Sequence, residues 1–268
     1  MEKLTIRRAE ARDFSRLTEL WDECFPDDID FRRFFFKALY NPRFASVCEM
    51  DGSVCAMLHA FPFAFKTPLG EMRAKYIYGV GTSLKCRGLG VASKLLKSVE
   101  NDCDFLVLIP QNKGLFKFYE KNGYNTEFYM QRITASPEGS EALSPASAAD
   151  IPLLNDLYEQ FTEGTIHPVR TREHWAATLE ELSAAGGGIS LFGEGYFAYY
   201  RDGKSIIISE IFPKTMSAAR LSAGALSSSC TVLFPGDGEP FGVARLLTQR
   251  ARDAFNLNAE KYLNLMHN

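Results

Sequence analysis

The chain has 268 residues, of which 46% are hydrophobic and 24% are charged. This composition is typical of a globular protein, and the length allows one large domain or two of about 130 residues. The formal net charge is −3. An acidic balance excludes a strongly basic nucleic-acid binder and gives no reason to expect an anionic membrane as partner. We therefore predict no nucleic-acid or membrane partner.

Two further features of the sequence bear on where the protein is located and on the redox state of its cysteines. No apolar stretch approaches the roughly 20 residues of a membrane helix, and the first residues lack the apolar core of a signal peptide. A cytoplasmic protein is expected. The six cysteines include no C-x-x-C pair and mostly lie inside apolar runs. This pattern favours reduced core thiols over zinc ligands or a disulfide framework, so no metal is predicted.

Before residue 70, the pattern predicts a strand, two helices and a hairpin. The strand covers residues 4–8, and the helices would begin after the capping residues Asp13 and Asp28. The hairpin joins residues 45–50 to 53–66 through an Asp-Gly turn. Paired strands of this kind form the antiparallel start of a sheet.

The rest of the chain is organised around residues 76–99. An apolar run rich in β-forming residues passes through a Lys/Arg/Gly loop into a helical pattern. Gly88 and Gly90 leave main-chain N–H groups unobstructed where the helix begins, and Lys85 and Arg87 add positive charge. A strand, a glycine-rich turn and a helix in this order favour a phosphate or pyrophosphate site. Gly79 and Gly81, just before the loop, are where a bulge or a close ligand would be expected.

A second motif follows a predicted buried strand over residues 105–109. It reads P-Q-N-K-G-L-F-K-F-Y-E-K-N-G-Y from residue 110 to 124, with Asn112 seven residues before Tyr119. The two motifs resemble those of the GCN5-related N-acetyltransferases (GNAT). The pyrophosphate loop of that family has Arg or Gln, two residues, Gly, one residue, and Gly or Ala. The matching residues here are Arg87, Gly90 and Ala92 in the loop, and Asn112, Tyr119, Glu120, Lys121, Gly123 and Tyr124 in the second motif.

The second half repeats the order of the first in weaker form. Residues 128–134 would close the first sheet, and the Ser/Ala/Pro/Gly-rich residues 136–149 have linker composition. Two helices, a hairpin, a strand, a helix and further strands follow. The expected elements are helices from Asp150 and over 173–182, strands 189–193, 195–201 and 205–212, a helix 216–226, strands 231–234 and 241–247, and a terminal helix 256–266. Phe-Pro-Lys-Thr replaces the glycine-rich loop after Ile211, so one cofactor site per chain is predicted.

We therefore predict an α/β protein with a mixed sheet, similar to the Eis-type branch of GNAT proteins, in which a second GNAT-like half follows the first. The predicted division is an acyl-CoA-binding domain at 1–135, a linker at 136–149, and a degenerate domain at 150–268 that lacks the loop.

The resemblance implies acetyl-CoA, or another short acyl-CoA, as co-substrate. Val80 and Thr82 would bond the pantetheine arm, Asn112 would also bond the cofactor, and Tyr119 would protonate the departing thiolate. The pyrophosphate would be held by Lys85, Arg87, Gly88, Leu89, Gly90, Val91 and Ala92. The general base stays open, because residues 75–82 contain no carboxylate. The candidates are Glu71, His59, Glu210 and a water chain.

The predicted function is acyl transfer to a primary amine of a small molecule or peptide. Two alternatives remain: a non-catalytic acyl-CoA sensor or scaffold, and a tRNA-dependent aminoacyl transferase of the tandem-GNAT type. A homo-oligomer is left open, and no motif identifies the acceptor.

Overall fold

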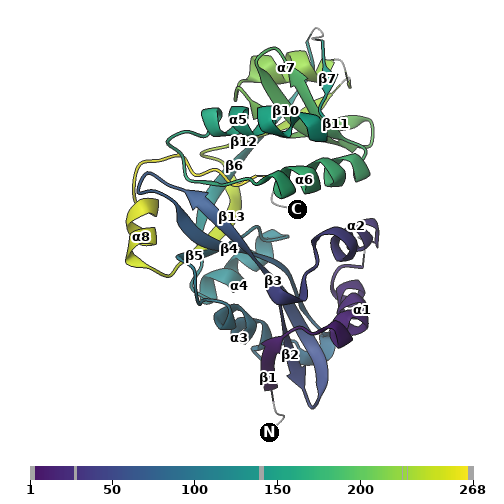
Figure 1. Ribbon diagram of the computed structural model, residues 1–268, viewed down its shortest axis with the longest axis vertical. Helices are drawn as coiled ribbons and strands as arrows, with labels where there is room; N and C mark the ends of the chain where they lie inside the picture. The colour runs from purple at the N-terminus through teal and green to yellow at the C-terminus, as the bar shows by residue number, and fades with distance from the viewer. Residues whose placement is uncertain (1–3, 27–28, 139–141, 225, 228, 265–268) are drawn as a thin grey trace. The chain divides into compact units, whose positions relative to one another are not determined.

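The computed structural model describes residues 4–26, 29–138, 142–224, 226–227 and 229–264, and the chain divides into two compact units (Figure 1). Unit 1 consists of Met1–Phe65, Glu71–Asn125 and Val243–Ala254, and unit 2 of Lys66–Gly70, Thr126–Gly242 and Phe255–Asn268. The mixed α/β class is confirmed. No helix in the described part of the chain is long and apolar enough to cross a membrane.

Unit 1 is a mixed sheet with helices on both faces. Its strands follow the order β1-β2-β3-β4-β5-β13, and all neighbours are antiparallel except the parallel pair β4–β5. The elements are β1 (Leu4–Arg8), α1 (Phe14–Cys24), α2 (Ile29–Phe34), β2 (Ala45–Met50), β3 (Ser53–Lys66), β4 (Met72–Thr82), α3 (Val91–Ser98), β5 (Phe105–Leu108), α4 (Lys113–Lys121), β13 (Glu239–Leu246) and α8 (Gln249–Phe255). The predicted hairpin is β2–β3.

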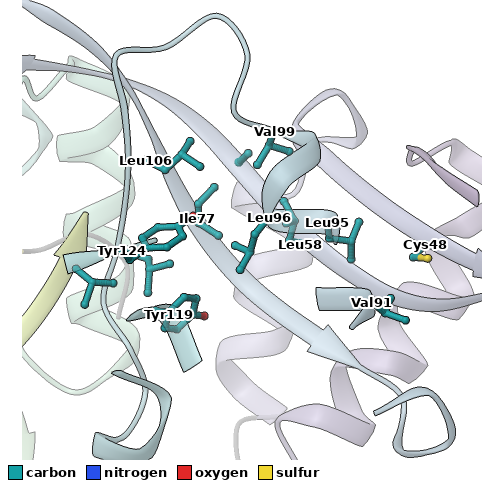
Figure 2. Close-up of a cluster of buried hydrophobic side chains, with 14 of the residues drawn as sticks. Cys48, Leu58, Ile77, Val91, Leu95, Leu96, Val99, Leu106, Tyr119 and Tyr124 are labelled. Carbon is teal, nitrogen blue, oxygen red and sulfur yellow. The ribbon is translucent and has the colours of Figure 1, made fainter. Parts of the chain in front are cut away.

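The helices on the two faces of the sheet pack against alternate residues of the strands, because successive side chains on a strand point to opposite faces. Figure 2 shows the face covered by α3 and α4, where Ile77 of β4 and Leu106 of β5 pack with Leu95 and Leu96 of α3. Leu95 and Leu96 are at most 2% exposed, and burying each contributes about 1.5–3 kcal/mol. Tyr78, next to Ile77, packs on the opposite face against α1.

The beginning of α1 differs from the prediction. Asp13 precedes the helix, but its side chain does not cap it. The carboxylate instead accepts hydrogen bonds from Arg7 at 2.7 and 2.8 Å and from the N–H of Glu10 at 2.7 Å. Tertiary pairing with Arg7 thus uses the oxygens that a cap would need. The other predicted cap, Asp28, lies outside the described residues.

Unit 2 repeats this plan. Its strand order is β7-β9-β10-β11-β12-β6, and β11–β12 is its parallel pair. The elements are β6 (Asn125–Ala135), β7 (Ser144–Pro145), α5 (Ile151–Phe161), β8 (His167–Pro168), α6 (Arg172–Ala184), β9 (Gly188–Phe192), β10 (Gly195–Asp202), β11 (Ser205–Phe212), α7 (Met216–Gly224) and β12 (Cys230–Pro235). In each unit two helices follow the first strand, and one helix connects the parallel pair.

One strand of each unit comes from the other half of the sequence. In unit 1 the neighbour of β5 is β13, with Val243 opposite Leu108. In unit 2 the neighbour of β12 is β6, with Cys230 opposite Ala135. The prediction that residues 128–134 close the first sheet is therefore wrong: β13 pairs beyond β5 inside unit 1. The two compact units differ from the predicted domains in the same way, because unit 1 takes in residues 243–254.

Two further segments differ from the prediction. The linker 136–149 contains β7, whose Ser144 pairs with Leu191 at the edge of the unit 2 sheet. The terminal helix over 256–266 is not formed in its described part, 256–264. Tyr262 and Leu263 are both buried there, and Lys261 forms a parallel bridge with Ile166. Two consecutive buried side chains and a main-chain bridge suit an extended segment better than one face of a helix.

Candidate active site

The two parallel strands of unit 1 part before the end of β4. Their pairing runs from Ala74–Phe105 to Tyr76–Val107 and then stops, while β4 continues to Thr82. Among the described residues, main-chain groups on this side of residues 77–82 therefore have no partner strand. A wedge between parallel strands, open at their carboxyl ends, is a common place for a ligand in an α/β sheet.

A β-bulge shapes the parted end of β4. Met57 of β3 pairs with Gly81 and His59 pairs with Tyr78, so Gly79 and Val80 together stand opposite Leu58. Gly79 has φ = +56°, a conformation that glycine adopts without strain. The predicted bulge is thus present at Gly79. Bulges re-aim main-chain and side-chain groups and occur next to active sites.

The loop between β4 and α3 is held by Glu23 of α1 and by a side chain of the loop itself. The carboxylate of Glu23, at the end of α1, accepts hydrogen bonds from Ser83 Oγ at 3.0 Å and Leu84 N at 2.6 Å. These bonds, the one to the Leu84 N–H foremost, lower the pKa of Glu23. Arg87 Nε donates to the carbonyl oxygen of Thr82 at 3.1 Å. The loop therefore has a defined shape before any ligand arrives.

The glycines of the loop leave its outer side open. Gly88 and Gly90 have φ values of +79° and +72°, and a Cβ atom at either position would meet no atom within 4 Å. The N–H groups of residues 87–93 have no main-chain acceptor in normal hydrogen-bond geometry among the described residues. Unpaired N–H groups at the start of a helix carry partial positive charge and bind anions.

The other predicted pyrophosphate residues fall into two groups. Lys85, Arg87 and Leu89 are exposed, with Leu89 at 48%. Val91 is buried in the core at 1% exposure, so only its main chain can face a ligand, and Ala92 is half-buried beside it. The structure brings the predicted residues together on one loop, and whether they bind coenzyme A stays a prediction.

The second motif forms the start and the core face of α4. Asn112 caps this helix, because its Oδ1 accepts a hydrogen bond from Gly114 N at 3.0 Å. Its amide nitrogen remains as a donor for a ligand. Tyr119 is 6% exposed and packs in the same cluster as Leu95 and Leu96 of α3 (Figure 2). Burial raises the pKa of Tyr119 to about 12.

Two of the three residues considered as general base are unsuitable, one because of its distance along β4 and the other because of its hydrogen bonds. Glu71 is exposed and precedes β4, so about 3.3 Å per residue places it roughly 30 Å from Val80. Glu210 belongs to unit 2 and is 1% exposed. Its carboxylate accepts two 2.7 Å bonds from Arg170, a 2.7 Å bond from Tyr196, and a bond from Tyr262. Neither carboxylate is free to take a proton at the wedge.

His59 is the candidate that lies at the bulge. A Cβ atom at Gly79 would stand 3.1 Å from its Nδ1. The side chain is fully buried, and in normal hydrogen-bond geometry neither ring nitrogen has a partner among the described residues. Burial is the larger cause and lowers the pKa of His59 to about 4, while the main chain of Tyr78 acts in the opposite direction. The imidazole is therefore neutral at physiological pH.

Sequence reasoning missed Glu23. Nothing in its local pattern distinguishes it from the other acidic residues of α1, since its role depends on a loop 60 residues later in the chain. Among the described residues, no group of His, Cys, Asp and Glu side chains is arranged to hold a metal ion.

The family model of the acetyltransferase (GNAT) domain matches residues 5–126, which include the parted strands, the loop and α4. Residues 5–126 form a GNAT acetyltransferase domain. The enzyme class is accordingly N-acetyltransferase. No curated protein sequence matches the chain significantly.

Solved structures share the fold of the GNAT domain and of the remainder of the chain. A GCN5-related N-acetyltransferase from Kribbella flavida has a TM-score of 0.72 at 16% identity, over 93% of this chain and 72% of its own. A conserved protein of unknown function from Enterococcus faecalis V583, described as a probable N-acyltransferase, has a TM-score of 0.74 at 15% identity. The match covers 94% of this chain and 74% of that protein. Eis1 from Mycobacterium abscessus has a TM-score of 0.62 at 12% identity, and the match covers 90% of this chain and 73% of Eis1. At these identities the likeness concerns the fold.

Proposed function

We propose that the protein transfers the acetyl group of acetyl-CoA to the primary amine of a small molecule or peptide. The observation that carries this proposal is the coincidence of two features in unit 1. The main-chain N–H groups of residues 87–93 have no main-chain acceptor among the described residues, and they follow within a few residues of the stretch of β4 that does not pair with β5. A diphosphate would be held by the loop, and the pantetheine arm would lie along the unpaired edge of β4.

Within this proposal, the positive end of α3 and the side chains of Lys85 and Arg87 offset the charge of the diphosphate. Val80 and Thr82 offer main-chain groups to the amide-rich arm, and the Asn112 amide nitrogen offers one more donor. The bulge at Gly79 sets the direction of the β4 main chain where the thioester would lie. Fixing the thioester beside the amine supplies much of the rate enhancement, because it removes the entropy cost of encounter.

Tyr119 would act on the leaving group. With a pKa of about 12, its hydroxyl is protonated throughout the physiological range and is available as a donor. Complete proton transfer to a thiolate of pKa about 8.5 is uphill by about 5 kcal/mol. Tyr119 therefore stabilises the thiolate by a hydrogen bond as it forms, and the phenol need not lose its proton for long.

Calorimetry and a thiol-release assay test this function. Acetyl-CoA should bind with one site per chain, and an amine panel should release free thiol. Tyr119→Phe should lower kcat about 100-fold, in the usual range for a positioned acid, and leave the Kd for acetyl-CoA unchanged. Binding without turnover on any amine would favour the non-catalytic sensor, and the absence of binding would refute both.

A neighbouring phenol gives a matched control. Tyr124 lies 5.5 Å from Tyr119 between ring centroids, and its buried hydroxyl has no hydrogen-bond partner in the part of the chain that the structure describes. Tyr124→Phe removes the same atom from the same cluster but should keep kcat. An equal loss in both variants would mean that packing, and not the hydroxyl of Tyr119, accounts for the effect.

A further inference from the structure

A cavity of about 480 Å³ lies in unit 2, where the start of α5 meets the start of α6. The two helices pack against each other and against β10. Volumes of roughly 300–1,000 Å³ are usual for small-molecule sites. All residues that line the cavity belong to unit 2, and none of them belongs to the loop after β4.

The cavity leads from the surface toward the core of unit 2. Among its lining residues, Pro152 and Arg172 are exposed. Ile151, Arg170 and Trp175 also line it and are buried. A small molecule that enters from solvent therefore meets side chains of the core.

Arg170 has one donor left over. Its Nη1 and Nη2 donate to the two carboxylate oxygens of Glu210 at 2.7 Å, and Nη2 also donates to the carbonyl oxygen of Asn264 at 3.1 Å. The third nitrogen, Nε, is buried and has no hydrogen-bond partner among the described residues. The rings of Tyr158 and Trp175 hold the guanidinium in this orientation, with centroids 4.0 and 4.7 Å from its Cζ. Buried donors are nearly always paired, so this N–H calls for a ligand or an ordered water.

Asn155 supplies a second donor, and its orientation is fixed. Trp175 Nε1 donates to Asn155 Oδ1 at 3.1 Å. Because an indole N–H can only donate, this bond determines which atom of the amide is the oxygen. The Nδ2 atom forms no hydrogen bond with a residue that the structure describes. It therefore remains as a donor at the cavity.

The free polar atoms of the lining side chains are thus all donors, and one positive charge is left over. Glu210 balances the charge of Arg170, whereas Arg172 forms no ion pair within the described part of the chain. The acidic residues next to the lining residues in the sequence do not themselves line the cavity; they are Asp150, Asp156 and Glu173. The rest of the lining is apolar or aromatic. A matching ligand brings acceptors, a single negative charge and an apolar body.

We propose that this cavity is a second ligand site of the chain and binds an organic monocarboxylate with an apolar or aromatic body. The carboxylate accepts hydrogen bonds from Asn155 Nδ2 and Arg170 Nε, and the exposed guanidinium of Arg172 balances its charge. The body packs on the apolar lining. A phosphate dianion would keep an unbalanced charge, and an amine would find no acceptor. The site is independent of acetyl transfer.

Calorimetry with the full-length protein tests the ligand class. 3-Phenylpropionate should bind with one site per chain and a Kd of about 0.1 mM. The neutral 3-phenylpropionamide, acetate and inorganic phosphate should each bind at least about tenfold more weakly, because each lacks the charge, the body or the single charge state. Saturating acetyl-CoA should leave the Kd for 3-phenylpropionate unchanged.

Two variants test the donors. Asn155→Asp keeps the size of the side chain and an acceptor for Trp175 but replaces the free donor by a carboxylate, so it should weaken binding of 3-phenylpropionate by about 100-fold. Arg172→Gln removes the exposed charge and should weaken it about tenfold. The matched control is Arg201→Gln, because Arg201 is an exposed arginine of unit 2 outside the cavity lining; it should bind as wild type does. Circular dichroism checks that each variant is folded.

Several outcomes would overturn the inference. Equal affinity for the acid and its amide would show that no charge is recognised, and tighter binding of phosphate would refute the monocarboxylate class. Equal losses in Arg172→Gln and Arg201→Gln would mean a general effect of surface charge. Displacement of 3-phenylpropionate by acetyl-CoA would mean that both occupy one site, and no binding at about 10 mM would refute the site. The proposed function stands or falls by acetyl-CoA binding and thiol release, which these variants leave unchanged.

Discussion

Units 1 and 2 follow the same order of strands and helices but differ after the fourth strand of the sheet, which is β4 in unit 1 and β11 in unit 2. In unit 1 the end of β4 leads into a loop over residues 83–90, and the two ring nitrogens of the buried His59 on the neighbouring strand β3 have no hydrogen-bond partner among the residues that the structure describes. In unit 2 only residues 213–215 separate β11 from α7. The buried carboxylate on β11, Glu210, accepts hydrogen bonds from three side chains of unit 2.

This difference separates a buried polar group that is paired from one that is not. A buried charge is tolerated when it is paired and fully hydrogen-bonded, and Glu210 meets both conditions through Arg170, Tyr196 and Tyr262. His59 meets neither condition and stays neutral. The buried polar side chain beside β4 is therefore left without partners, whereas the buried carboxylate on β11 is paired, although Arg170 Nε, His167 Nε2 and Arg220 Nε of unit 2 also have no partner among the described residues.

The largest effect should come from breaking the exchange of strands between the units. Residues 1–135 expressed alone lack β13 and leave the edge of β5 unpaired, so they should aggregate or remain unfolded. Residues 1–125 joined by a flexible Gly/Ser linker to residues 243–254 should fold and bind acetyl-CoA. Circular dichroism and calorimetry check both forms. A stable fragment 1–135 would show that β13 is dispensable.

Removal of the charge of Glu210 should rank second. Glu210→Gln leaves the buried Arg170 without its counter-charge and should lower the free energy of unfolding by about 3–5 kcal/mol. The double change Arg170→Met with Glu210→Leu should lose less, because no unpaired charge remains. Urea denaturation measures both. Acetyl-CoA affinity should not change in either folded variant, since the ion pair lies in unit 2.

His59 should make the stability depend on pH. Its pKa falls from 6.5 to about 4 on folding, so below pH 6.5 the unfolded chain binds a proton that the folded chain does not. Stability is fully present above pH 6.5 and is lost as pH falls toward 4, by about 3 kcal/mol in total.

His59→Asn should flatten this part of the stability curve. Burial also lowers the pKa of His167, which contributes with the same sign, so the measured quantity is the difference between wild type and variant in urea unfolding from pH 4 to 7. Parallel curves would show that the imidazole of His59 is not buried in its neutral form.

The smallest effect on stability, and the sharpest comparison of the units, concerns two glycines. Gly90 of unit 1 and Gly203 of unit 2 have φ values of +72° and +60° in open space. Alanine at either position should cost about 1–2 kcal/mol through backbone strain. Only Gly90→Ala should also weaken acetyl-CoA binding, by more than tenfold. Equal affinities of the two variants for acetyl-CoA would show that the loop at Gly90 does not bind the cofactor.

Much of the local structure could be predicted because it depends on neighbouring residues. The loop glycines and the bulge at Gly79 follow from the conformations that glycine allows. The failures concern partners far away in the chain. Asp13 is paired with Arg7 instead of capping α1, and Glu23 supports a loop that its own sequence context does not reveal.

The sequence by itself determined the order of elements, the loop after β4, and its absence after β11, since periodicity and glycine positions are local properties. Only the tertiary structure decided which strands complete each sheet and which buried polar groups find partners. β13 joins β5 across more than 130 residues of chain, and strand pairing of this range leaves no local signal. The same holds for His59, whose ring nitrogens have no partner among the described residues because apolar rings from other parts of the chain, such as Trp21 and Tyr40, pack around it.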